Sequence, residues 1–194
     1  MNRSLRMCCL AVALVVPNSR LNAATFFNFT SAPGAWIGQG QTLSFTDVSV
    51  SVTYNLGAYS DSVNFSADGY AFTLVSTNLT IPTVGYYSNA TRWPFQGSGP
   101  GMAFTAPGRG DNTLTGYFNV LQAVYDTNGQ VVSFAVDFLQ YDEGGLSAWN
   151  MGSIRYDSTI PEPSSILLTA FGLSIVYFGA RRKRTGTAGS SHSA

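Results

Sequence analysis

Few residues in the central part of the sequence could do chemistry. Residues 24–160 contain no histidine, cysteine or lysine, and the single histidine of the chain is His192. Within that segment this excludes a Ser-His-Asp triad, a Cys-His pair, a Schiff-base lysine and a histidine-ligated zinc site. Carboxylate chemistry remains, in which two acidic side chains flank a glycosidic bond. Asp137, Asp142 and Glu143 are the candidates, but Gly144 directly after Asp142-Glu143 is typical of a turn, so we expect no enzyme activity.

Acidic residues could also bind a hard cation. Clusters at residues 110–112, 126–129 and 142–143 offer the carboxylate and amide oxygens that calcium takes. None of them forms a complete ligand loop. Because Asp and Asn beside Gly favour turns, the sequence predicts turns here, with no metal site and no cofactor.

A third group of candidates is aromatic. Large rings can stack on sugar faces, or they can fill a hydrophobic core. Exposed coplanar rings in a groove would favour carbohydrate binding, and buried rings would favour a role in the core. The candidates are Trp36, Tyr86, Tyr87, Trp93 and Trp149.

Charge narrows the range of partners. All ten acidic residues lie between residues 24 and 163, where the basic residues are Arg92, Arg109 and Arg155. Nucleic acid requires a basic surface to neutralise its phosphates. We therefore expect no nucleic-acid partner.

The elements that would position these side chains are β-strands. Residues 48–55 alternate apolar and polar side chains with the period of a strand, and Gly-rich turns separate similar segments. Nine short strands favour an antiparallel β-sandwich or jelly roll over residues 24–160. The expected strands span residues 25–30, 41–46, 48–55, 70–75, 78–81, 101–105, 115–125, 131–140 and 152–156.

One hairpin is predicted over residues 117–139. Asn128-Gly129 lies in its turn, and both residue types tolerate the positive φ angles of tight hairpins. In the second strand we expect four side chains to point inward: Val132, Phe134, Val136 and Phe138.

The N-terminus has the order of a secretory signal peptide. Arg3 and Arg6 precede an apolar stretch at residues 7–16, and small residues follow at Ala23 and Ala24. We expect residues 1–23 to be a signal helix, cleaved after Ala23 or Ala24. Cys8 and Cys9 are the only cysteines and would leave with it, so the mature chain would have no disulfide.

The C-terminus carries three signals in order. Pro161-Glu162-Pro163 is followed by an uncharged apolar run at residues 164–180, which as a helix would span roughly 25 Å of the bilayer. A basic cluster then favours a cytoplasmic end, with a disordered tail at residues 185–194. The cluster consists of Arg181, Arg182, Lys183 and Arg184.

This order resembles the PEP-CTERM sorting tail of exported Gram-negative bacterial proteins. The resemblance implies that Pro161, Glu162 and Pro163 are the sorting tripeptide, and that an exosortase, a membrane-embedded processing enzyme, recognises the tail. It also implies bacteria that make extracellular polysaccharide or biofilm matrix. The ten residues after Arg184 depart from the family, whose chains end near the basic cluster. An ordinary single-pass anchor is the alternative reading of the tail.

The sequence therefore predicts a non-catalytic exported protein of the cell surface or extracellular matrix. Its body would lie outside the cytoplasm, tethered to membrane lipid by the tail and released after processing. A carbohydrate-binding module of the extracellular polysaccharide is the alternative function.

Overall fold

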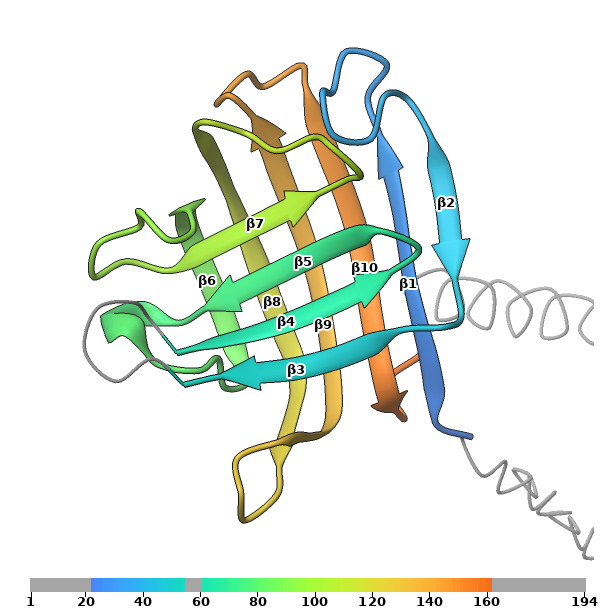
Figure 1. The fold of residues 1–194 in the computed structure, drawn as a ribbon, viewed down its shortest axis with the longest axis vertical. Helices are drawn as coiled ribbons and strands as arrows, with labels where there is room; N and C mark the ends of the chain where they lie inside the picture. Colours follow the sequence, from blue (N-terminus) through green and yellow to red (C-terminus); the bar gives the residue numbers. More distant parts are fainter. Residues whose placement is uncertain (1–21, 55–60, 162–194) are drawn as a thin grey trace, which may run out of the picture.

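The described part of the chain is built from β-strands. The computed structural model describes residues 22–54 and 61–161 (Figure 1). No helix among these residues is long and apolar enough to cross a membrane. Most of the expected signal peptide and everything after Pro161, including the expected helix at residues 164–180, lie outside the described residues. The elements are β1 (Ala24–Ser31), β2 (Thr42–Phe45), β3 (Ser49–Thr53), β4 (Ser62–Ala67), β5 (Tyr70–Val75), the 3-10 turn η1 (Thr77–Leu79), β6 (Gly85–Arg92), β7 (Gly101–Thr105), β8 (Leu114–Tyr125), β9 (Val131–Asp142) and β10 (Trp149–Ser158).

All ten of these strands belong to one sheet, in the order β2-β1-β10-β9-β8-β6-β7-β5-β4-β3. Neighbouring strands are antiparallel except β6 and β7, which run parallel. The all-β prediction is confirmed. The prediction of an antiparallel sandwich or jelly roll is corrected to a single mixed sheet, because β6 hydrogen-bonds to β8 on one side and β7 on the other. β6 thereby joins the strands β2, β1, β10, β9 and β8 to the strands β7, β5, β4 and β3, which would otherwise form two separate sheets.

The sheet curls into a half-barrel. In Figure 1, β3, β4, β5 and β7 cross steeply in front of β8, β9 and β10. Residues 46–48 connect β2 directly to β3, so the two edge strands of the sheet follow one another in the chain.

Aromatic side chains fill the space inside the half-barrel. The Phe72 ring of β5 stacks on the Phe138 ring of β9 with their centroids 4.1 Å apart. The rings of Phe27 on β1 and Phe104 on β7 meet edge to face at 5.8 Å. These contacts join strands from the two halves of the sheet, and large buried rings supply much of the hydrophobic free energy of such a core.

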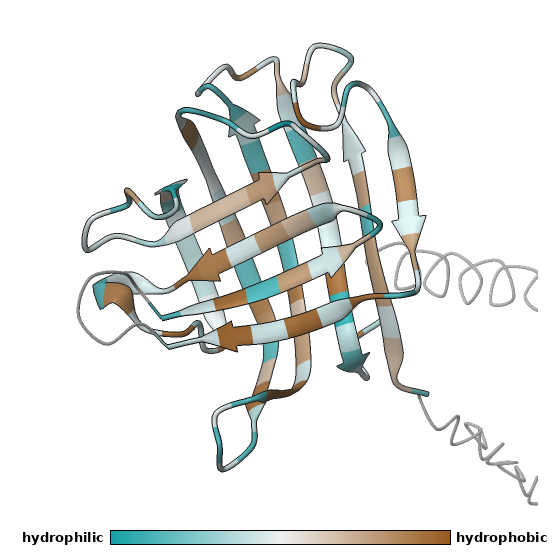
Figure 2. Cartoon of the chain, viewed as in Figure 1, coloured by the Kyte–Doolittle hydropathy of each residue, from teal (hydrophilic) through white to brown (hydrophobic). Residues whose placement is uncertain are grey.

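Alternation along the strands selects which side chains enter this core. Apolar and polar bands alternate along β2, β3 and β4 in Figure 2. Phe134, Val136 and Phe138 point inward and are buried, as predicted, but Val132 is exposed. The pairing explains the error: Val124 pairs with Ser133 and Tyr125 with Val131, so Val132 is the extra residue of a β-bulge.

The predicted strand boundaries are mixed in accuracy. Residues 70–75 and 101–105 match β5 and β7, whereas β4 and β6 were not predicted. The strand expected at residues 78–81 is wrong. Asn78 and Leu79 have φ angles of 57° and 64° in η1, which a strand does not allow.

The predicted hairpin is present as β8 and β9. Oδ1 of Asp126 accepts hydrogen bonds from the backbone N–H groups of Asn128 and Gln130, both at 2.8 Å. Gly129 adopts a φ of 79°, whereas Asn128 is not among the residues with positive φ. The acidic cluster at residues 126–129 is therefore a turn, as expected.

Candidate functional site

A cluster of buried polar side chains lies at one end of the half-barrel. Gln140 and Asp142 come from the end of β9 and Asn150 from the start of β10. Asp111 joins them from the loop between β7 and β8. We call these four residues the polar cluster. Buried polar groups require hydrogen-bond partners, so the contacts of the cluster indicate its role.

Half of the polar cluster holds the loop between β1 and β2. Oδ2 of Asp142 accepts from the backbone N–H of Ile37 at 2.9 Å, and Oδ1 of Asn150 accepts from that of Gly38 at 3.1 Å. The Asn150 amide in turn donates to Asp142 at 2.6 Å. The Ile37 side chain is fully buried, so this loop closes the end of the core. Gly38 is required here because a Cβ would collide with Ser31 and Asn150.

The other half of the polar cluster contains a carboxyl group with a raised pKa. Nε2 of Gln140 donates to Oδ2 of Asp111 at 2.9 Å. Burial, followed by the negative charge of Asp142 and a hydrogen bond with it, raises the pKa of Asp111 to about 8. Oδ1 of Asp111 is buried and accepts no hydrogen bond from the described residues, which fits a protonated carboxyl group whose O–H faces Asp142.

Glu143 fastens the neighbouring loop from outside. Its carboxylate accepts from the backbone N–H groups of Asn112 at 2.7 Å and Thr113 at 3.3 Å. The hydrogen bond from Asn112 is the main cause that lowers the pKa of Glu143. The acidic clusters at residues 110–112 and 142–143 thus meet in space. Among the described residues, however, no group of three or more His, Cys, Asp or Glu side chains could hold a metal ion.

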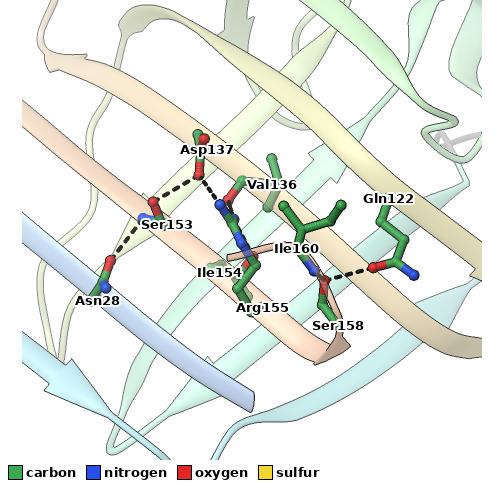
Figure 3. Close-up of polar contacts among 9 residues, drawn as sticks. All are labelled: Asn28, Gln122, Val136, Asp137, Ser153, Ile154, Arg155, Ser158 and Ile160. Carbon is green, nitrogen blue, oxygen red and sulfur yellow. Dashed lines mark hydrogen bonds and ion pairs between the residues drawn. The ribbon is translucent and has the colours of Figure 1, made fainter. Parts of the chain in front are cut away.

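Asp137 and Asp142, two of the carboxylates considered for glycoside chemistry, do not form a pair. Asp137 and Asp142 both lie on β9 but five residues apart, which places them on opposite faces of the sheet. Asp137 faces outward and forms an ion pair with Nη2 of Arg155 at 2.9 Å (Figure 3). It also accepts from the Ser153 hydroxyl at 2.8 Å. Asp137 and Asp142 therefore cannot flank a common sugar bond.

Arg155 is unusual because its side chain is fully buried on the outer side of the sheet. Nη1 donates to the backbone carbonyls of Val136 and Ile154, both at 3.0 Å. Burying a guanidinium costs free energy unless the charge is paired, so Arg155 requires the carboxylate of Asp137 as its counter-ion.

The three tryptophans proposed for ligand binding lie on separate elements. Trp36 is in the loop between β1 and β2 and is 52% exposed. Trp93 follows β6, precedes a cis peptide bond to Pro94 and is half-buried. Trp149 opens β10 and pairs with Tyr141 of β9. No common aromatic platform is formed by these three rings.

The two proposed tyrosines differ from one another. The Tyr87 ring stacks on buried Phe118 at 4.6 Å, so it belongs to the core. Tyr86 lies on the outer face, 62% exposed, and its ring is tilted against that of Tyr117 at a distance of 5.4 Å. Tyr117 was not predicted, and the pair exists because β6 and β8 are neighbours in the sheet.

A groove of about 620 Å³ crosses the outer face of β2, β1, β10 and β9 and ends at Tyr117 of β8. We call it the outer groove. The strand register arranges the outward side chains into two rows that run across the strands. The first row is Ser44, Asn28, Ser153, Asp137, Asn119 and Tyr86. The second row is Thr42, Thr30, Met151, Leu139 and Tyr117.

Within the outer groove, the first row is held by a chain of contacts (Figure 3). Oδ1 of Asn28 accepts from the backbone N–H of Ser153 at 3.2 Å. The Ser153 hydroxyl donates to Asp137, whose orientation is fixed by Arg155. Sequence reasoning did not select Asn28 or Ser153, because residues 28, 153 and 137 come together only through the pairing of β1, β10 and β9.

Comparison with known proteins identifies no similar protein. A scan against protein-family models finds no match, and searches of curated proteins and of solved structures return no significant one. The function is therefore inferred from the sequence and the geometry.

Proposed function

We propose that this is a non-catalytic exported protein of the bacterial cell surface or extracellular matrix, tethered and then processed through its C-terminal tail. The observation that carries the proposal is the order of three signals after the body. Pro161-Glu162-Pro163 precedes the uncharged run at residues 164–180, and four basic residues follow it. An apolar run of this length with a basic end is typical of a membrane-spanning helix with a cytoplasmic end.

The end of the folded body supports a short connection to such a tail. The last strand, β10, ends at Ser158, only three residues before Pro161. The Ser158 hydroxyl donates to Oε1 of Gln122 on β8 at 2.6 Å, and the backbone N–H of Ile160 donates to the Ser158 hydroxyl at 3.1 Å. The tripeptide therefore begins directly where the sheet ends, which would keep the body close to the membrane surface.

The roles of the acidic side chains support a non-catalytic body. Asp142 and Glu143 accept hydrogen bonds from the backbone of neighbouring loops, and Asp137 neutralises Arg155. Each of these carboxylates has a structural task that substitution would disturb. This agrees with a body whose polar residues maintain the fold.

The processing step is tested by expressing the chain in hosts that contain or lack an exosortase and measuring the mass of the mature protein. We expect loss of the tail only where the enzyme is present. A chain with Pro161, Glu162 and Pro163 replaced by alanine is the matched control and should keep its tail in both hosts. An unchanged mass in both hosts would contradict the proposal and leave an ordinary single-pass anchor.

Carbohydrate binding is the second candidate function. It is favoured by the exposed Tyr86 and Tyr117 rings beside the outer groove. Tyr87 does not contribute, since it packs in the core, and Trp36, Trp93 and Trp149 come from other elements than Tyr86 and Tyr117.

A further inference from the structure

We propose that the outer groove binds a neutral polysaccharide chain laid across the strands, with Tyr117 as the stacking ring and Asn28 and Asp137 as the polar contacts. The inference deepens the second candidate function. It rests on the proposed function only in that an exported matrix protein meets extracellular polysaccharide.

The first argument is the pairing of a donor with an acceptor. Asn28 uses its carbonyl oxygen to accept from Ser153, which leaves its amide nitrogen as a donor. Oδ1 of Asp137 accepts from the Ser153 hydroxyl and forms the ion pair with Arg155, so Oδ2 is left as an acceptor for a ligand. Neither the Asn28 nitrogen nor Oδ2 of Asp137 has a partner among the described residues. One hydroxyl of a sugar can accept from Asn28 while a neighbouring hydroxyl donates to Asp137.

The second argument is rigidity. Arg155 is fully buried and also bonded to two backbone carbonyls, so it holds Asp137 in one orientation. Ser153 connects Asp137 to Asn28, and all three residues lie on paired strands. Polar groups that are already ordered lose little conformational entropy when a ligand binds.

The third argument is the apolar side of the outer groove. Met151 is 52% exposed and lies in the second row between Thr30 and Leu139. At the end of the groove is the Tyr117 ring, which offers an apolar face together with a polar hydroxyl. A sugar ring presents the same combination, an apolar face of C–H groups and a rim of hydroxyls.

Charge selects a neutral polysaccharide over an acidic one. Among the described residues that line the outer groove, Asp137 is the one acidic residue, and Arg155 neutralises it. Residues 24–163 as a whole contain three arginines against ten acidic residues. An anionic polysaccharide would be repelled by this body.

The test is isothermal titration calorimetry with the full chain, purified in a detergent without a sugar headgroup. The probes are neutral hexasaccharides of glucose, mannose and galactose at up to about 1 mM. We expect at least one to bind, and Tyr117→Ala to weaken that binding about tenfold. Tyr54→Ala is the matched control, because Tyr54 is similarly exposed but does not line the groove. It should leave the affinity unchanged.

Two further variants keep the test decisive if Tyr117→Ala does not fold. Met151→Arg places a bulky charge in the middle of the groove at an exposed site and should abolish binding. Asn28→Ala should weaken it several-fold. The absence of binding to all three probes, or equal binding by the wild type and Met151→Arg, would overturn the proposal. Tail processing is unaffected by these variants, so a failure here is distinguishable from a failure of the sorting proposal.

Discussion

Asp111 makes the stability of the fold depend on pH. Its folded-state pKa is raised from 3.8 to about 8 by burial and by Asp142. Between these two values the folded state holds a proton that the unfolded state releases. The unfolding free energy should therefore fall as the pH rises from about 4 to 8. Below this window the contribution of Asp111 is constant and fully present, and above it that contribution is lost.

The magnitude follows from the same two values. The interval from 3.8 to about 8 corresponds to about 6 kcal/mol at roughly 1.4 kcal/mol per pH unit. Movement of the loop that carries Asp111 would recover part of this free energy. We expect at least about 2 kcal/mol of lost stability between pH 5 and pH 8.

The substitution Asp111→Asn removes the ionisable proton while keeping the shape of the side chain. Its amide oxygen can accept from Gln140 and its amide nitrogen can donate to Asp142. The variant should be more stable than the wild type at pH 8, and its pH dependence should be flatter. Urea denaturation at four pH values between 5 and 8, followed by tryptophan fluorescence, measures both quantities.

The matched control is Asp68→Asn, an identical change in an exposed turn. Its pH dependence should follow that of the wild type. Parallel pH curves for the wild type and Asp111→Asn, or a variant that is less stable at pH 8, would refute the assignment of the proton to Asp111.

Three other substitutions test the packing and the turns. Phe138→Ala removes the ring that stacks on Phe72 and should lower the unfolding free energy by about 4 kcal/mol in urea denaturation. Asp137→Ala leaves Arg155 buried without its counter-ion and should cost about 3 kcal/mol, whereas Arg155→Met combined with Asp137→Ala should recover part of the loss. Gly129→Ala forces a side chain into a φ of 79° and should lower the melting temperature, while a neutral result would contradict the turn geometry.

Local pattern predicted the strands whose alternation is regular. β5 and β7 match the predicted boundaries because turns bound them on both sides. β6 was missed because a register irregularity between Tyr87 and Ala90, with Asn89 at a φ of 55°, breaks the alternation. β4 was missed because its serines and its asparagine resemble a turn, although Val63 and Phe65 are buried.

The candidate sites depend on contacts that local pattern does not contain. Asn28 and Ser153 are 125 residues apart in the sequence and become neighbours only when β10 inserts beside β1. Of the five aromatic residues selected from the sequence, only Tyr86 forms an exposed ring pair, and its partner Tyr117 belongs to a different strand. The register of a sheet is set by long-range pairing, so a surface built from it requires the strand order.

The pairing of β1 with β10 constrains when the protein can fold. Ala24 pairs with Ser158, so the first strand of the sheet has one of its neighbours at the far end of the body. When the chain emerges N-terminus first, from a ribosome or through a membrane, β1 appears long before β10. Until β10 has also emerged, β1 lacks the hydrogen bonds of that pairing. Assembly that waits for distant segments is slow. A chaperone that shields β1 during this delay would raise the yield of folded protein.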